Sequence, residues 1–382
     1  MANKKAQKLR NPFVYEGYVS SEYFCDRTVE TENIISDLEN GRNLTLVSPR
    51  KIGKTGLIMH AFERIKQKYP DAVCIYIDIF HTQNQYDFVQ ALGNAIVQER
   101  LLNAKNKNKV LSFFKSLRPV ISFDSLTGAP TVSVTLERTN TEHTLKGIFD
   151  YLRDCGKEVF LAIDEFQAVT NYPEKGTEAL LRSYIQFVHN VHFVFSGSKQ
   201  HLMYEIFGSP ERPFYQSTAM MSLEPLYKEI YYDFANHFFK DNHGELSEEV
   251  FYNLYDRFSG YTWYVQSVLN KLYEHEKRVV SKQQVSDAIL DVLADKRGQY
   301  EMLMTFLTDN QSRLIKAIAM EDVVSQPQSI DFLQKYHLPN ASSVKKALDT
   351  MADKDLVYKT AKGYIVYDRF FDLWLKRTFV GM

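Results

Sequence analysis

Short runs of hydrophobic residues alternate with longer amphipathic segments through the first half of the chain. The runs have the length of buried strands and lie at 44–47, 72–79, 159–163 and 191–195. Segments whose apolar residues recur at helical spacing lie at 28–40, 56–69, 84–101, 141–155 and 178–189. Because a continuous apolar run is typical of a strand buried on both faces, the pattern predicts a parallel sheet sandwiched between helices, an α/β fold.

The stretch between the second and third runs has a different pattern. A charged break lies at 103–109, and the segments 120–125 and 131–137 flank Leu126-Thr127-Gly128-Ala129-Pro130. Polar and apolar residues alternate in both segments. Alternation on both sides of a turn that contains glycine predicts a small β-hairpin.

After Leu226 the strand pattern stops. Amphipathic segments at 227–239, 247–258, 262–275 and 281–294 predict a helical domain. From about Tyr300, amphipathic segments at 310–320, 329–336 and 341–353 precede two short strands around Ala361-Lys362-Gly363. Three helices followed by a hairpin predict a winged helix. We therefore expect three domains, at 1–226, 227–299 and 300–382.

Composition and charge narrow the classes of protein. With 382 residues, 45% of them hydrophobic, the chain can bury a sizeable core in two or three domains. A net charge of −1 gives no overall attraction to nucleic acid or acidic membranes. No run approaches the roughly 18 apolar residues of a membrane span, and no apolar segment of a secretory signal follows the basic first residues. Three widely spaced cysteines, Cys25, Cys74 and Cys155, are expected to be reduced thiols of a cytoplasmic protein.

The candidate chemistry begins with a phosphate-binding pattern after the first strand. Ser48-Pro49-Arg50-Lys51-Ile52-Gly53-Lys54-Thr55 leads through Gly56 into an amphipathic helix. Backbone N–H groups of such a loop and the helix N-terminus point at one anion. We predict that this segment binds the phosphates of ATP, with Lys54 on the β- and γ-phosphates and the Thr55 hydroxyl on Mg²⁺. The usual pattern opens with Gly, so Ser48 must hold a backbone conformation open to a residue with a Cβ.

A second feature distinguishes a nucleotide site from an ordinary basic turn before a helix. The apolar run 159–163 ends in Asp164 and Glu165. Ligands of open α/β sheets bind at the carboxyl ends of the strands. We expect Asp164 to hold Mg²⁺ and Glu165 to polarise the attacking water. The two motifs in this order predict a P-loop NTPase that binds ATP and Mg²⁺.

With these motifs placed, the chain resembles the archaeal-type AAA+-like ATPases, close to origin-recognition initiators and to the STAND signalling NTPases. The resemblance extends over nearly the whole chain. Beside the P-loop and the acidic pair, it rests on Asn11-Pro12-Phe13, Phe24, Arg27, Ser196-Gly197-Ser198 and the winged helix. It implies an α/β core, a helical lid and a C-terminal winged helix. One departure is Gly260-Tyr261-Thr262, where the family's lid carries Gly-x-Pro, and losing that proline loosens a preset φ.

The resemblance also implies how the nucleotide is surrounded. The segments near Asn11–Phe13 and Phe24–Arg27 would wrap the adenine. Ser196, or else Ser198, would sense the γ-phosphate, and both end a strand parallel to that of Asp164. Taken alone, Phe13 and Phe24 also fit hydrophobic staples, and the serines fit a plain turn.

An arginine finger is the third implied element. Arg212 follows the sensor strand where related chains place an arginine, and Arg182 is the alternative. Such an arginine, supplied in trans, neutralises charge on the transferring phosphoryl group. A surface ion pair is the other explanation of either residue. The candidate catalytic residues are therefore Glu165, Ser196 and Arg212.

The winged helix leaves the partner open. The residues that a DNA-reading wing would use are Ser342, Ser343, Lys345, Lys346, Lys359 and Lys362. From residue 341 onward, eight Lys and Arg stand against five Asp, which is a small surplus for a dedicated DNA binder. Winged helices also contact proteins or inhibit their own chain.

Three hypotheses follow. The main one is a Mg²⁺-dependent ATPase whose hydrolysis drives a conformational change. The second is a nucleotide-gated DNA-binding protein, similar to an initiator or loader. The third is a STAND-like switch with slow turnover that assembles with a protein partner or with copies of itself. No membrane partner is expected.

Overall fold

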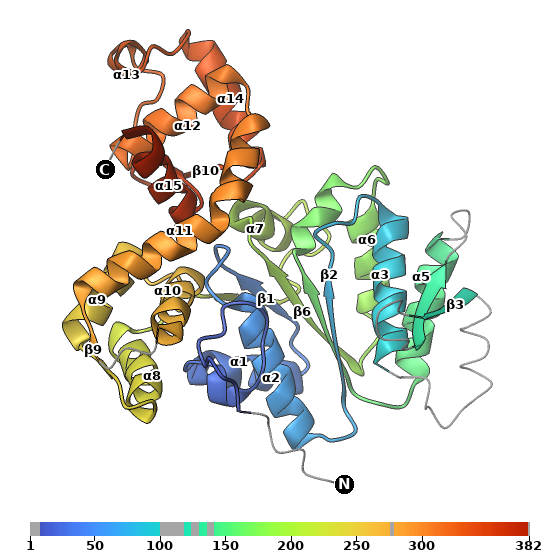
Figure 1. Cartoon of the computed structure of the whole chain (residues 1–382). Coiled ribbons are helices and arrows are strands. Elements are labelled where there is room, and N and C mark those ends of the chain that lie inside the picture. Colours follow the sequence, from blue (N-terminus) through green and yellow to red (C-terminus); the bar gives the residue numbers. More distant parts are fainter. Residues whose placement is uncertain (1–7, 100–117, 124–129, 136–140, 276–278, 381–382) are drawn as a thin grey trace. The chain divides into compact units, whose positions relative to one another are not determined.

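The computed structural model describes residues 8–99, 118–123, 130–135, 141–275 and 279–380. The chain forms two compact units (Figure 1). The core unit is Glu16–Leu226, and the helical unit combines the segment up to Tyr15 with Tyr227–Met382. The strand pattern of the sequence stops at the same residue, Leu226. The N-terminal segment, which the sequence analysis placed with the core, groups with the helical unit instead.

The core unit is built on a five-stranded parallel sheet in the order β2-β5-β6-β1-β7 (Figure 1). The strands are β1 (Leu44–Val47), β2 (Val73–Asp78), β5 (Val159–Asp164), β6 (Val191–Gly197) and β7 (Ala219–Ser222). Every residue of β1, β5 and β6 is buried, which confirms the α/β fold predicted from the continuous apolar runs. The sequence did not predict β7, because this short edge strand is only partly buried and carries no continuous apolar run.

Helices cover both faces of this sheet (Figure 1). On one face, α1 (Thr28–Glu39) packs against α2 (Lys54–Lys68). The other face carries α3 (Gln85–Gln98), α5 (Thr141–Asp154) and α6 (Thr177–Ile185). The remaining short elements are η1 (Ser21–Tyr23), η4 (Phe166–Asn171) and α7 (Gln200–Gly208).

Alternate strand residues face opposite layers, as the pleat of a β-strand requires. Ile75, Leu161 and Phe193 join the hydrophobic core formed with α3, α5 and α6. The residues between them, such as Tyr76 and Asp164, point to the side of α2, where their hydroxyl and carboxyl groups meet. The face toward α3, α5 and α6 is therefore largely apolar, whereas the face toward α2 carries the polar groups of Tyr76 and Asp164.

The predicted hairpin is present as β3 (Arg118–Phe123) and β4 (Pro130–Thr135), which pair antiparallel. The turn between them, at 124–129, lies outside the described residues, as does the charged break at 103–109.

The helical unit contains the helices predicted after Leu226. The first group is α8 (Lys228–Asp241), α9 (Glu248–Arg257), α10 (Thr262–Glu274) and α11 (Lys282–Thr305), with a small parallel pair of β8 (Glu245–Leu246) and β9 (Val279–Val280). A Ser281–Gln284 capping box starts α11, which runs through the domain boundary that we predicted between residues 299 and 300. The predicted lid and winged helix thus share one helix.

The winged-helix pattern follows α11. Its elements are α12 (Asp309–Glu321), α13 (Ile330–Lys335), α14 (Ala341–Asp353), β10 (Val357–Lys359), β11 (Tyr364–Val366) and α15 (Arg369–Val380). β10 and β11 pair antiparallel, which gives the three helices and hairpin expected from the sequence. The helix α15 was not predicted from the sequence. No helix among the described residues is long and apolar enough to cross a membrane.

The N-terminal segment is anchored inside the helical unit by Phe13. This ring is fully buried and lies 5.4–5.9 Å, centroid to centroid, from the rings of Phe238, Phe239 and Tyr273. Asn270 fixes the backbone here, because its side chain donates to the Phe13 carbonyl (2.9 Å) while its own carbonyl accepts from the Asn11 amide (2.8 Å). With no exposed surface, the Phe13 ring is a packing residue, and the implied adenine contact of the segment Asn11–Phe13 stays a prediction.

Replacing Phe13 by Ala should destabilise the helical unit by roughly 3 kcal/mol, since a buried aromatic ring is lost and a cavity is left. Both tryptophans of the chain, Trp263 and Trp374, lie in this unit, so urea unfolding followed by tryptophan fluorescence reports on it. The matched control Ile330→Ala removes a side chain of a residue that is 72% exposed and should cost less than roughly 0.5 kcal/mol. Equal unfolding midpoints for the two variants would contradict the packing role of Phe13.

Candidate functional site

The loop between β1 and α2, residues 48–53, is the segment predicted to bind phosphates, called the phosphate loop below. It crosses the carboxyl end of the sheet and begins α2 at Lys54, directly after Gly53. Positive φ angles occur at Lys51 (68°) and Gly53 (104°), not at Ser48. Ser48 is fully buried and holds a conformation open to any residue, so the serine in place of the usual first glycine fits without strain.

Lys54 lies folded against this loop. Its ammonium group donates to the carbonyls of Ser48 (3.2 Å) and Pro49 (3.3 Å), and the residue is only 7% exposed. Burial lowers the pKa of the amine, and the carboxylates of Glu165 and Asp164 oppose that shift. A buried cation at the N-terminus of a helix, held by carbonyl groups, is suited to meet an anion in the loop.

Asp164, at the end of β5, is the polar centre of the site. It is 5% exposed, and its Oδ2 accepts from the Thr55 hydroxyl (3.1 Å) and the Tyr76 hydroxyl (2.6 Å). Its Oδ1 accepts from the Ser196 hydroxyl and from the backbone N–H of Glu165 (3.0 Å). The structure thus brings together three residues predicted from the sequence, Thr55, Asp164 and Ser196.

Tyr76 is a site residue that the sequence analysis missed. Burial, reinforced by the Asp164 carboxylate, raises the pKa of its phenol, which keeps the proton that it donates to Asp164. A signal was present in the sequence: Tyr76 and Asp78 interrupt the apolar strand two residues apart, and residues at that spacing share one face of a strand. The sequence did not show that Tyr76 would bond to Asp164, because that contact depends on the pairing of β2 with β5.

Glu165 stands next to Asp164 in a left-handed backbone conformation, φ 55° and ψ 40°. Such a conformation is uncommon for a residue with a Cβ and is found preferentially at functional sites. Its Oε2 accepts from the Ser198 hydroxyl at 2.7 Å and from the Gln167 amide at 2.5 Å. Of the two serines considered as sensors, Ser196 therefore contacts Asp164, and Ser198 contacts Glu165.

Phe24 and Arg27 lie in different surroundings. Phe24 stacks on His60 of α2, with centroids 4.7 Å apart, and a Cβ added to Gly56 would lie 3.2 Å from its ring. The ring therefore lies beside the first turn of α2. Arg27 is buried, with its guanidinium on the Glu30 carboxylate (2.6 Å) and the Glu224 carbonyl (2.6 Å). These contacts tie the start of α1 to the chain after β7, and a nucleotide contact of either residue stays a prediction.

Arg212, the predicted arginine finger, is engaged within its own unit. Its guanidinium lies 2.6 Å from the Glu178 carboxylate on α6 and 3.6 Å from that of Glu205 on α7. Burial raises the pKa of Glu178, and the positive charge of Arg212 opposes the shift. A role of Arg212 at a phosphate stays a prediction, and it requires these ion pairs to break.

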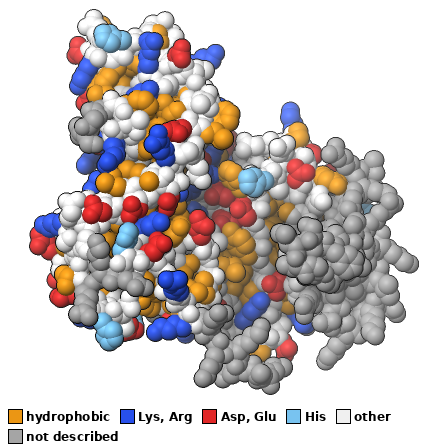
Figure 2. Space-filling view, viewed as in Figure 1, with side chains coloured by type: hydrophobic (Ala, Val, Ile, Leu, Met, Phe, Trp, Pro, Cys, Tyr) orange, Lys and Arg blue, Asp and Glu red, His pale blue; other side chains and the backbone are white. Residues whose placement is uncertain are grey.

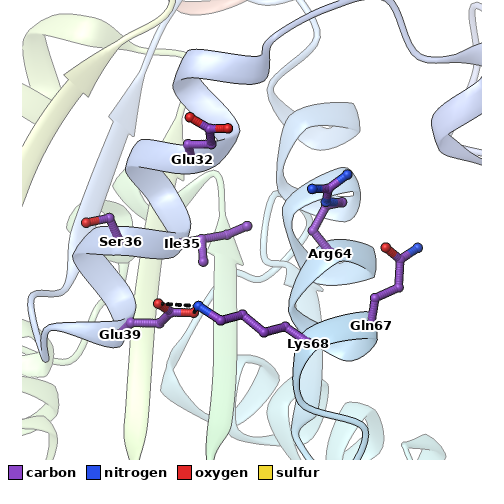
Figure 3. Close-up of a pocket in the computed structure, with 7 residues that line it drawn as sticks. All are labelled: Glu32, Ile35, Ser36, Glu39, Arg64, Gln67 and Lys68. Carbon is purple, nitrogen blue, oxygen red and sulfur yellow. Dashed lines mark hydrogen bonds and ion pairs between the residues drawn. The ribbon is translucent and has the colours of Figure 1, made fainter.

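A separate hollow lies between α1 and α2 (Figure 3). It is lined by Glu32, Ile35, Ser36, Glu39, Arg64, Gln67 and Lys68. Figure 3 shows Lys68 reaching across to Glu39, and the two form an ion pair at 2.6 Å. Because its α2 residues belong to the C-terminal half of the helix, this hollow is distinct from the phosphate loop at the N-terminus of α2.

Comparison with known structures agrees with this fold. The chain is similar to the Walker-type ATPase of Pyrococcus abyssi, with 16% identity, a TM-score of 0.63, and coverage of 96% of this chain and 99% of that one. It is also similar to the ORC1 protein of Aeropyrum pernix, solved in complex with DNA, with 13% identity, a TM-score of 0.54 and 94% of each chain covered. At these identities the likeness shows the fold alone.

Sequence comparison gives the family. No curated protein sequence matches the chain. A family described as a probable winged helix domain matches residues 298–377, which supports the winged helix seen in the structure. A second family, described as an ATPase domain predominantly from Archaea, matches residues 24–268 and includes the phosphate loop, Asp164 and Glu165. The chain therefore belongs to this family of ATPase domains found predominantly in Archaea.

Proposed function

We propose that the protein is a Mg²⁺-dependent ATPase whose turnover drives a conformational change. The observation that carries the proposal is the convergence of Thr55, Asp164 and Ser196 at the carboxyl ends of the sheet, beside the loop that holds Lys54. Membership of an ATPase domain family supports ATP as the nucleotide. The proposed phosphate-binding segment is 48–56, and the proposed catalytic group is Glu165.

The residues present fit a magnesium ion. Mg²⁺ takes oxygen ligands and is usually bound by one or two protein groups together with phosphate oxygens. The Thr55 hydroxyl and the Asp164 carboxylate are such ligands and lie 3.1 Å apart. When bound, the ion would neutralise charge on the β- and γ-phosphates. Tyr76 and Ser196, which donate to the two oxygens of Asp164, would keep the carboxylate oriented toward Thr55.

The protein side chains divide the remaining work. Lys54 would exchange its bonds to the Ser48 and Pro49 carbonyls for the β- and γ-phosphates. Glu165 would orient and polarise the attacking water, and Ser196 would respond to the γ-phosphate through its bond to Asp164. Lys54 begins α2, Glu165 directly follows β5 and Ser196 lies on β6, so loss of the γ-phosphate would change contacts at three places of the core at once, which supports a conformational response.

Lys54→Ala should weaken ATP binding at least roughly tenfold, equivalent to about 1.4 kcal/mol, because the cation facing the phosphates is lost. Isothermal titration calorimetry measures the affinity. Lys68→Ala is the matched control: it removes a lysine from the other end of α2, where the partner is Glu39, and should leave ATP affinity unchanged. Unaltered ATP binding by the Lys54 variant would overturn the phosphate-loop assignment.

Glu165→Gln should separate binding from chemistry. The amide keeps the shape of the side chain but cannot act as a carboxylate base, so turnover should fall roughly 10²-fold or more while Mg-ATP still binds. Phosphate release and calorimetry measure the two quantities. The control Glu158→Gln changes a glutamate directly before β5, at the opposite end of the strand, where it bonds to His192. Equal phosphate release by both variants would show that Glu165 does not orient the water.

A second candidate function, DNA binding, is favoured by four exposed lysines of the winged helix. Lys345 and Lys346 on α14 and Lys359 and Lys362 around the β10–β11 turn are all exposed, and none of them forms a salt bridge with another described residue. On the face shown in Figure 2, blue Lys and Arg side chains are scattered over the α12–α15 part rather than gathered in one stripe. The solved complex of the ORC1 protein with DNA supports the same candidate.

If these four lysines contact phosphates, the affinity for duplex DNA should fall with salt by about 0.9 logarithmic units per decade for each phosphate neutralised. Replacing all four by Ala should flatten this slope and weaken binding equally on unrelated sequences, as fluorescence anisotropy at several salt concentrations can measure. The control replaces four exposed lysines of the core unit (Lys66, Lys68, Lys146 and Lys175) and should leave the slope unchanged. An unmodified protein that binds no duplex at low salt, with or without ATP, would exclude this function.

A further inference from the structure

The Glu165 carboxylate is held by one of its two oxygens. Oε2 accepts three hydrogen bonds: from the Gln167 amide (2.5 Å), the Ser198 hydroxyl (2.7 Å) and the Ser198 backbone N–H (3.3 Å). Among the described residues, none donates to Oε1. A carboxylate fixed in this way by one oxygen keeps the lone pairs of the other available to a further donor, such as a water molecule.

Gln167 is held in place at an energetic cost. It is 4% exposed, and its Oε1 is buried without a hydrogen-bond partner among the described residues. An unsatisfied buried acceptor opposes folding, and each such group in a native protein calls for an explanation. Turning the amide over would place Oε1 against the Glu165 carboxylate, where two acceptors repel each other. The bond to Glu165 therefore decides which way the amide points.

Gly197, which has no side chain, leaves room for the side-chain amide of Gln167. A Cβ built on Gly197 would lie 2.3 Å from Gln167 Oε1 and 2.5 Å from the sulfur of Met203. Packing alone does not explain an amide at this position, since an apolar side chain of similar length would fill the same space beside Met203 without an unpaired oxygen. The amide is explained by what its NH₂ group does, which is to hold Glu165.

Ser198 links Glu165 to the phosphate loop. Its hydroxyl donates to Glu165 and accepts from the Nε of Arg50 at 3.3 Å. The Arg50 guanidinium also lies over the Phe80 ring, 4.9 Å from the centroid, which fixes its plane. A residue of the phosphate loop and the proposed water-orienting carboxylate thus share one hydroxyl group.

We propose that Gln167 and Ser198 are positioning residues, which anchor Glu165 through Oε2 so that Oε1 faces the attacking water, and that Ser198 couples this anchor to Arg50. The inference rests on the proposed function, in which Glu165 polarises water. Losing either anchor frees the carboxylate to rotate away from the water, so turnover falls while the phosphate loop keeps its affinity for ATP.

The test replaces Gln167 by Met, which keeps the length of the side chain and removes the unpaired oxygen. Turnover, measured as phosphate release at saturating Mg-ATP, should fall roughly tenfold or more, while the dissociation constant for ATP changes less than about twofold. The stability of the variant should not fall with its turnover: the midpoint of thermal unfolding should equal that of the unmodified protein or lie roughly 2 °C above it. The control Gln186→Met, at the exposed end of α6, should change neither rate nor affinity.

A second variant tests the other anchor. Ser198→Ala should lower turnover by a similar factor, and Ser198→Thr, which keeps the hydroxyl, should restore most of it. Ser183→Ala is the control, because that hydroxyl donates to the Leu180 carbonyl of its own helix. In a Glu165→Gln background, Gln167→Met should change the residual rate less than about twofold, since a positioning residue acts through the group that it positions.

The outcomes distinguish this inference from the function on which it rests. An unmodified protein that binds ATP and releases no phosphate overturns the ATPase proposal. An active protein in which Gln167→Met leaves turnover unchanged, or lowers it equally in the Glu165→Gln background, overturns the positioning role. A lowered unfolding midpoint with a parallel loss of ATP binding would show that Gln167 serves the packing of the core instead.

Discussion

The site depends on one buried carboxylate. Asp164 is almost removed from water, and a buried carboxylate is tolerated only when hydrogen-bond donors surround it. Its donors are the hydroxyls of Thr55, Tyr76 and Ser196 and the N–H of Glu165, which belong to α2, β2, β6 and the end of β5. Asp164 receives all four hydrogen bonds only when each of these elements is in place. The packing of the core therefore also fixes the geometry of the site.

The order of the strands explains why these donors can meet. β5 lies between β2 and β6, so Tyr76 and Ser196 reach Asp164 from its two neighbours. β6 in turn pairs with β1, which leads into the phosphate loop. The two-residue period of the strands sends one set of side chains into the apolar core and the other set toward α2. A parallel arrangement brings all the carboxyl ends to one edge, where polar groups accumulate.

The structure assigns different physical roles to residues that the family resemblance grouped together. Phe13 is a buried packing residue of the helical unit, whereas Phe24 lies beside the first turn of α2 in the core unit. Arg212 and Arg27 are both engaged by carboxylates of their own unit. Arg50, which the sequence marked only as part of the phosphate loop, reaches Ser198 at the end of β6. The position of a residue in a motif thus predicted the part of the fold in which it lies, but not the residues with which it forms hydrogen bonds or ion pairs.

The sequence by itself determined the α/β core, the acidic pair at the end of β5 and the helices from α8 to α14, because these depend on periodicity and on residues close together in the chain. The tertiary structure alone decided the strand order, the hydrogen bond of Tyr76 to Asp164 and the anchoring of Glu165 by Ser198. Those contacts join residues separated by 88 and 33 positions. They arise only when β2, β5 and β6 lie side by side, and no local pattern encodes which strands become neighbours.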